Sequence, residues 1–187
     1  VTPRTPQAWI SRSGHPSETR RIGAMLVDRN GVAYPCPELQ FESAKNLPII
    51  YLPISGENLI LAGRKIEISE LAHCVRLLDS ATEADSESIQ WIDSLKQVNA
   101  WSLELTTRQG TTATFSLGDH PRQMHSLRAA LDHAQQKSYD IDTINLIPKH
   151  NIPITTRMMD SAPHKIIALE PHMNRRDRDL ETLLNRN

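Results

Sequence analysis

Residues 101–117, WSLELTTRQGTTATFSL, alternate apolar and polar side chains on both sides of a glycine-containing turn. Alternation with a period of two is typical of strands that bury one face, and Arg108-Gln109-Gly110 supplies the turn. The segment therefore predicts an antiparallel hairpin whose apolar side packs on a core. Trp101 begins the alternation. The residues that we expect to be more buried than their neighbours are Leu103, Leu105, Ala113, Phe115 and Leu117.

Two other regions have strand character. Residues 22–34 contain Asn30-Gly31 between two apolar runs, and this dipeptide favours a hairpin because a type I′ turn needs a positive φ at both central positions. Near the end of the chain, the apolar run of residues 141–147 breaks at Pro148 and resumes at residues 152–157. This second region predicts the last strand of the domain.

Apolar residues at helical spacing predict one helix near residues 68–79 and another near 121–136. Pro121 fits the first turn of the second helix, where no backbone N–H is needed. Residues 86–98 are ambiguous between strand and helix. The predicted fold class is α+β: a curved, largely antiparallel β-sheet with the two helices packed on it. The predicted core includes Val27, Leu71, Val75, Leu127 and Leu131.

The chain of 187 residues is long enough for one domain of ordinary size. We assign residues 1–158 to this domain, because the apolar periodicity fades beyond them. Residues 159–187 are predicted to be a polar tail that is either disordered or forms a short helix.

Charge and composition argue against several classes of partner. Lys and Arg number 21 against 22 Asp and Glu, so the formal net charge is -1, which provides no basic footprint for nucleic acid and no basic cluster for lipid. With three Trp, three Tyr and two Phe, the chain is also poor in stacking platforms for single strands. A bridge between Cys36 and Cys74 is conceivable, but we expect two unpaired thiols.

Motifs for catalysis, cofactor binding and metal binding are missing from the sequence. It has no G-x-S-x-G nucleophile elbow, no glycine-rich phosphate loop and no H-E-x-x-H zinc helix. His120, His125 and His133 are spaced by five and eight residues, which does not place two imidazoles on one helical face. We therefore predict no catalytic, cofactor-binding or metal-binding residues, and we do not expect an enzyme.

In their order along the chain, these motifs resemble the β domain of the bacterial cell-division family FtsQ/DivIB. Residues 4–10, RTPQAWI, resemble the strand that opens that domain, and residues 26–32, LVDRNGV, resemble its hairpin. Either residues 47–50 or residues 52–56 match the leucine-proline motif that follows. The remaining matches, in the family's order, are a helix at 66–80, the hairpin at 101–118, a helix at 122–136 and a terminal strand at 144–146.

The resemblance implies a non-enzymatic, extracytoplasmic scaffold of the divisome without a cofactor. Such a protein crosses the inner membrane once, through a helix upstream of this chain, and places this domain on the periplasmic side. A small POTRA domain would also precede residue 1. The family binds FtsB- and FtsL-type division proteins and helps control septal cell-wall synthesis.

The expected binding site is the last strand, because an exposed sheet edge offers unpaired N–H and C=O groups to a partner strand. Edge strands also tolerate proline, here Pro148 and Pro153. The alternative is an ordinary core-facing edge strand without a partner. The predicted partner-binding residues are Ile144, Asn145, Leu146, Ile147, Lys149, His150, Ile152, Ile154 and Thr156.

This strand departs from the family pattern in several places. The family's aspartate is Asn145, and its arginine, tyrosine and tryptophan correspond to Ile147, Pro148 and Thr156. A salt bridge or an aromatic anchor must therefore be different or missing. Main-chain pairing does not depend on side-chain identity, so strand addition remains the expected mode, with Lys149 and His150 as rim charges that steer an acidic segment.

Two other functions compete with the division scaffold. A secreted or periplasmic enzyme with a dispersed site would show a deep pocket lined by converging polar groups. A generic extracytoplasmic adaptor unrelated to division would lack the upstream membrane helix. The sequence leaves both open.

Overall fold

The computed structural model describes residues 4–11, 25–52, 60–157 and 167–169. Within them the chain forms an open sheet of ten strands, together with four helices. The strands are β1 Pro6–Ser11, β2 Met25–Asp28, β3 Ala33–Tyr34, β4 Ile49–Tyr51, β5 Ile92–Asn99, β6 Ser102–Thr107, β7 Thr112–Ser116, β8 Ile141–Asn145, β9 Ile152–Thr156 and β10 Ile167–Leu169. The helices are α1 Glu38–Ala44, α2 Ser69–Ala84, α3 Ser88–Trp91 and α4 His120–Lys137.

The sheet is mixed, with the strand order β10-β9-β8-β7-β6-β5-β4-β1-β2-β3. The pairs β1–β4, β4–β5 and β7–β8 are parallel, and the other neighbours are antiparallel. Two of the parallel pairs, β4–β5 and β7–β8, have a long helix between their strands, α2 and α4 respectively. Such a helix carries the chain back along the sheet, so the second strand runs in the same direction as the first. The fold is therefore mixed α/β.

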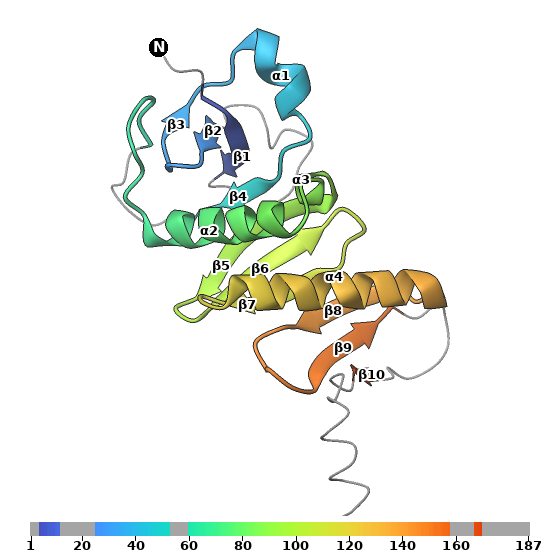
Figure 1. Ribbon diagram of the computed structural model, residues 1–187. Coiled ribbons are helices and arrows are strands. Elements are labelled where there is room, and N and C mark those ends of the chain that lie inside the picture. The colour runs from blue at the N-terminus through green and yellow to red at the C-terminus, as the bar shows by residue number, and fades with distance from the viewer. Residues whose placement is uncertain (1–3, 12–24, 53–59, 158–166, 170–187) are drawn as a thin grey trace, which may run out of the picture.

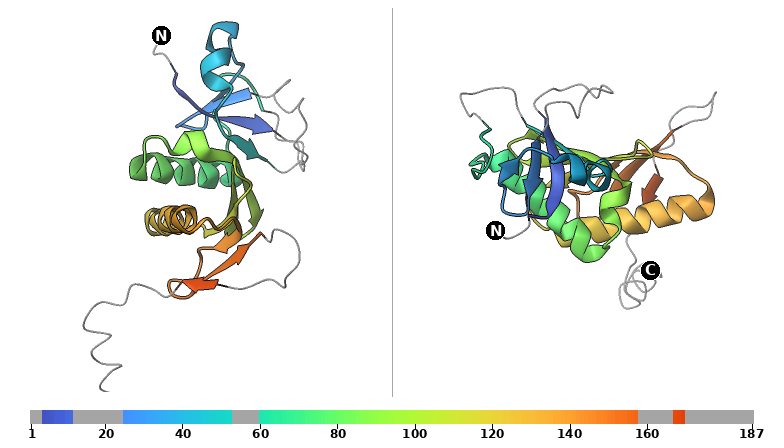
Figure 2. Two further views of the ribbon diagram at one scale, coloured as in Figure 1. Left: turned by 90° about the vertical axis from the view of Figure 1, so that its right-hand side faces the viewer. Right: turned by 90° about the horizontal axis from the view of Figure 1, so that it is seen from above.

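The two long helices lie side by side on one face of the sheet, which curves around them (Figures 1 and 2). They are the helices predicted near residues 68–79 and 121–136, and both are confirmed. The ambiguous residues 86–98 divide between the short helix α3 and the strand β5. On the opposite face, near β1 and β4, the short helix α1 covers a second and smaller apolar cluster.

The predicted hairpin is confirmed as β6 and β7. Its inward residues Leu103, Leu105, Ala113 and Phe115 are completely buried, and Leu117 is half-buried against the same core. Trp101 is 78% exposed and lies in the turn before β6. The other predicted core residues are also confirmed: Val27, Leu71, Val75 and Leu127 are buried, and Leu131 packs against them half-buried.

Both cysteines are free thiols, as expected. Cys36 is half-buried, whereas Cys74 lies in the core on α2. Burial raises the pKa of the Cys74 thiol to about 12, with a smaller contribution from Glu70. Because thiolates are the reactive form, Cys74 is a packing residue in the folded protein.

A histidine is buried at the start of α4. His120 is 6% exposed, and its Nε2 donates to the Ser116 carbonyl oxygen at 3.0 Å. Burial lowers the pKa of His120, the Ser116 carbonyl and Asp119 oppose that effect, and electrostatic interactions with His73 and Arg76 on α2 lower it further. The folded protein therefore holds this imidazole in its neutral form.

This burial predicts a pH dependence of stability. The unfolded chain binds the His120 proton near pH 6.5, and the folded chain binds it only at a lower pH, so the free energy of unfolding should fall as the pH drops below about 6.5. The His120→Gln variant keeps a side-chain donor for Ser116 and should lose part of this fall. Urea denaturation at pH 7.5 and pH 5.5 measures it. An equal fall in both proteins would contradict the assignment.

Candidate protein-binding edge of the sheet

The predicted partner-binding residues do not form one strand. Ile144 and Asn145 end β8, which lies between β7 and β9 and has no free edge. Leu146 continues this pairing, since its N–H donates to the Thr114 carbonyl at 2.9 Å. The expected open edge is therefore wrong for residues 144–146.

A turn explains why the expected strand divides. Pro148 has no N–H for a ladder, and Asn151 has a left-handed backbone with φ 53°, so the chain reverses and returns as β9. Ile147, Lys149 and His150 are exposed in this turn. Ile152, Ile154 and Thr156 lie on β9, where Ile154 is buried and the other two are half-buried.

The direction of the backbone groups on β9 follows from two hydrogen bonds. The N–H of Arg157 donates to the Asp140 carbonyl at 2.8 Å, toward β8. Backbone groups alternate in direction along a strand, so those of Thr155 and Pro153 also face β8. The hydrogen bond from Leu146 to β7 leads to the same assignment. Since the backbone groups of Leu146 face β7, those of the preceding residue, Asn145, face β9, where they lie opposite Pro153.

The outward-facing residues of β9 are consequently Ile152, Ile154 and Thr156. Proline at position 153 lacks only an N–H that would face β8, at Asn145, the last residue of that strand. The N–H groups of β9 that face away from β8 are all retained. Three of the predicted residues thus direct their backbone groups to the side of β9 that faces away from β8.

A strand from the predicted tail partly covers this edge. β10 pairs antiparallel with β9, and Ile167, Ala168 and Leu169 stand opposite Ile154, Pro153 and Ile152. The prediction that the tail is disordered or forms a short helix is wrong for these three residues; the rest of 159–187 lies outside the described residues. The apolar run IIAL at residues 166–169, within an otherwise polar segment, is the signal that could have revealed β10.

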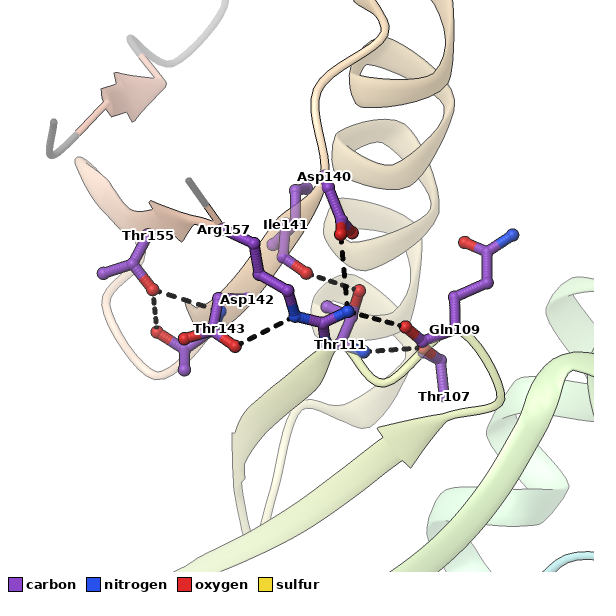
Figure 3. Close-up of polar contacts among 9 residues, drawn as sticks. All are labelled: Thr107, Gln109, Thr111, Asp140, Ile141, Asp142, Thr143, Thr155 and Arg157. Atoms are coloured by element: carbon purple, nitrogen blue, oxygen red, sulfur yellow. Dashed lines mark hydrogen bonds and ion pairs between the residues drawn. The ribbon is translucent and has the colours of Figure 1, made fainter. Parts of the chain in front are cut away.

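Arg157, which follows β9 directly, anchors the end of this strand (Figure 3). Its Nη1 donates to the Gln109 carbonyl at 2.9 Å and lies 3.4 Å from an oxygen of Asp140, while its Nε lies 3.3 Å from an oxygen of Asp142. No motif in the sequence points to this residue. Its partners come from β8, from the residue before β8 and from the β6–β7 turn, so Arg157 holds the end of β9 in place without lying on the strand.

Threonines join β8 to β9 beside this arginine. The register shifts between Ile141 and Thr143, and there the N–H of Thr143 donates to Thr155 Oγ1 at 3.1 Å. The two threonine hydroxyl oxygens are 2.6 Å apart, and Thr111 Oγ1 donates to the Ile141 carbonyl at 2.8 Å (Figure 3). Hydroxyl groups thus replace ladder bonds that the bulge interrupts.

The turn against which Arg157 packs requires glycine. Gly110 has φ +87°, and a Cβ there would lie 2.7 Å from Arg157 Nη2. Gly110→Ala should therefore lower the free energy of unfolding by about 1–2 kcal/mol and displace the guanidinium. Gly118→Ala is the matched control, since nothing lies within 4 Å of its Cβ position. Urea denaturation compares the two variants, and equal stabilities would contradict this role.

A cavity of about 480 Å³ lies at the C-terminal end of α4. Its charged lining residues Arg128, Asp132 and Asp140 each form an ion pair: Arg128 with Asp132 and with Asp85, and Asp140 with Arg157. Within the described residues no three His, Cys, Asp or Glu side chains are grouped to hold a metal ion. The cavity is thus lined by both polar and apolar side chains, and each of its charged residues has an oppositely charged partner.

Comparison with protein-family models and with curated proteins finds no match for the chain. The described part of the chain contains no helix with the length and apolar character needed to span a membrane. The side of β9 that faces away from β8, which β10 partly covers, is a feature that the geometry offers for binding.

Proposed function

We propose that this domain is a non-enzymatic scaffold of the bacterial divisome that binds an FtsB- or FtsL-type protein by strand addition to β9. In this proposal it lies on the periplasmic side of the inner membrane, anchored by an upstream helix, and helps control septal cell-wall synthesis. The order of sequence motifs that resembles FtsQ/DivIB supports the choice of partner. The observation that carries the binding mode is the outward direction of the backbone groups of Ile152, Ile154 and Thr156.

The surroundings of the edge suit a partner strand. Ile154 belongs to the main core and Ile152 packs against it, so aliphatic side chains of an added strand would extend an existing apolar surface. A strand that runs antiparallel to β9, as β10 does, would end near the 146–151 turn. Lys149 and His150 are exposed there, which favours acidic residues at the C-terminal end of the partner segment.

The test is a calorimetric titration of the full chain with the periplasmic part of the FtsB-like protein of the same organism. Thr156→Pro removes one outward N–H and should weaken binding roughly 3- to 10-fold, the loss of one main-chain hydrogen bond. Thr156→Val changes the same side chain but keeps the N–H, and it should bind within about twofold of the original.

Wild-type affinity in Thr156→Pro, with circular dichroism showing a folded protein, would rule out β9 as the docking edge. Deletion of residues 152–156 is a poorer test, because it also removes Ile154 from the core. A generic adaptor is distinguished by the upstream gene sequence. A membrane helix followed by a POTRA-type domain supports the division scaffold, whereas a cleaved signal peptide supports the adaptor.

A further inference from the structure

We infer that β10 is a built-in competitor: the chain closes its own β9 edge with residues 167–169, and a partner segment binds by displacing them. This inference rests on the proposed function, because it concerns regulation of the same edge. Its basis is the position of β10, which pairs with β9 along the side that faces away from β8.

The register shows which backbone groups β10 uses. Ile167 and Leu169 stand opposite Ile154 and Ile152, whose backbone groups face outward, so these two are the hydrogen-bonded pairs of the antiparallel ladder. Ala168 stands opposite Pro153 in the non-bonded pair between them. The proline of β9 therefore costs the β9–β10 ladder nothing, and the N–H of Ala168 points away from β9.

The register also defines the chemistry of the competing segment. β10 has the pattern aliphatic, small, aliphatic, and its aliphatic positions stand opposite Ile154 and Ile152 of the core face. A segment that replaces it must be extended, run antiparallel to β9 and carry aliphatic residues at alternate positions. Bulky or charged residues at both of those positions would be selected against.

Length gives the partner its advantage over β10. Among the described residues, β10 pairs with three of the five residues of β9, and none of these pairs includes Thr156. Its own advantage is the tether, since residues 157–166 join it to β9 and a short tether of this kind raises the effective concentration to the millimolar range. A partner strand of five residues or more can engage Thr156 as well, so it can displace β10 while shorter segments cannot.

The variants that test this inference are two prolines one residue apart. Ile167→Pro removes an N–H that is bonded to β9, and Ala168→Pro removes one that points away from it. Two probes are titrated into each full-length protein: a synthetic peptide of residues 164–172 and the FtsB-like periplasmic segment. Hydrogen exchange of the Ile154 amide, without a probe, reports whether β10 covers the edge.

We expect Ile167→Pro to speed exchange at Ile154 and to bind both probes about tenfold more tightly than the original chain, within the usual range of coupling between sites. Ala168→Pro should match the original chain in both measurements. Equal peptide affinity in the original chain and Ile167→Pro would overturn the self-closure. Tighter peptide binding by Ile167→Pro, with no binding of the FtsB-like segment to any form, would uphold the self-closure and reject the division function.

Discussion

Replacing Phe115 with alanine should lower the free energy of unfolding by about 3–5 kcal/mol. Phe115 is completely buried on β7, where it pairs with Leu103 of β6 and faces the core beneath the helices. Removal of the ring loses its transfer free energy and leaves a cavity between a sheet and a helix that cannot fully close over it. A domain of this kind is typically stable by about 5–15 kcal/mol, so the loss is a large fraction of the total.

Trp101→Ala is the matched control for Phe115→Ala. Trp101 lies in the turn before β6 and begins the same apolar alternation, but it is 78% exposed, and its replacement should change stability by no more than about 0.5 kcal/mol. Urea denaturation with comparison of the m-values measures both variants. Similar losses of unfolding free energy in the two variants would mean that the face of the hairpin that carries Phe115 is not the buried one.

The second large effect is expected at Trp9, on the other face of the sheet. Trp9 is 2% exposed, its Nε1 donates to the Ala44 carbonyl at 2.7 Å, and its ring meets Phe41 edge-on with the ring centroids 6.4 Å apart. It is the largest residue of the cluster that joins β1 to the end of α1. Trp9→Ala should therefore cost about 3–5 kcal/mol.

Two milder variants separate the contributions of Trp9. Trp9→Phe keeps an aromatic ring but loses the donor, and it should cost about 0.5–1.5 kcal/mol for the hydrogen bond, because the N–H of Leu47 still reaches the Ala44 carbonyl at 3.0 Å. Phe41→Ala should cost no more than about 1.5 kcal/mol from the ring contact. Thermal denaturation ranks the three variants. If Trp9→Ala proved no worse than Phe41→Ala, α1 would not depend on Trp9.

The proposed function and the self-closure make different demands on the β9 edge. Strand addition needs outward backbone groups, which β9 has at three positions. Regulation needs an occupant weaker than the partner, which the three residues of β10 supply. An edge covered in this way is also protected from nonspecific pairing with other chains, a common hazard of open sheets.

Local patterns in the sequence were enough to predict the β6–β7 hairpin, the two long helices and most of the core. The alternation in residues 101–117 indicates which side chains of the two strands are buried. The helical spacing of apolar residues, among them Leu71 and Val75 on α2 and Leu127 on α4, indicates which face of each helix is buried. Both signals depend on residues close together in the chain, so they can be recognised without knowing against which surface the strand or helix packs.

Tertiary structure alone decided which strands are neighbours and which strands lie at the margins of the sheet. Residues 141–156 carry no pattern that places β8 inside the sheet and β9 near its margin. That arrangement depends on the parallel pairing of β8 with β7, which are separated in the chain by α4. The hydrogen bond between Arg157 and Gln109 joins positions far apart in the chain. The pairing of β10 with β9 involves a segment without regular apolar periodicity. Strand pairing uses main-chain groups that every residue type carries, so side-chain patterns specify the buried face of a strand but not its neighbour.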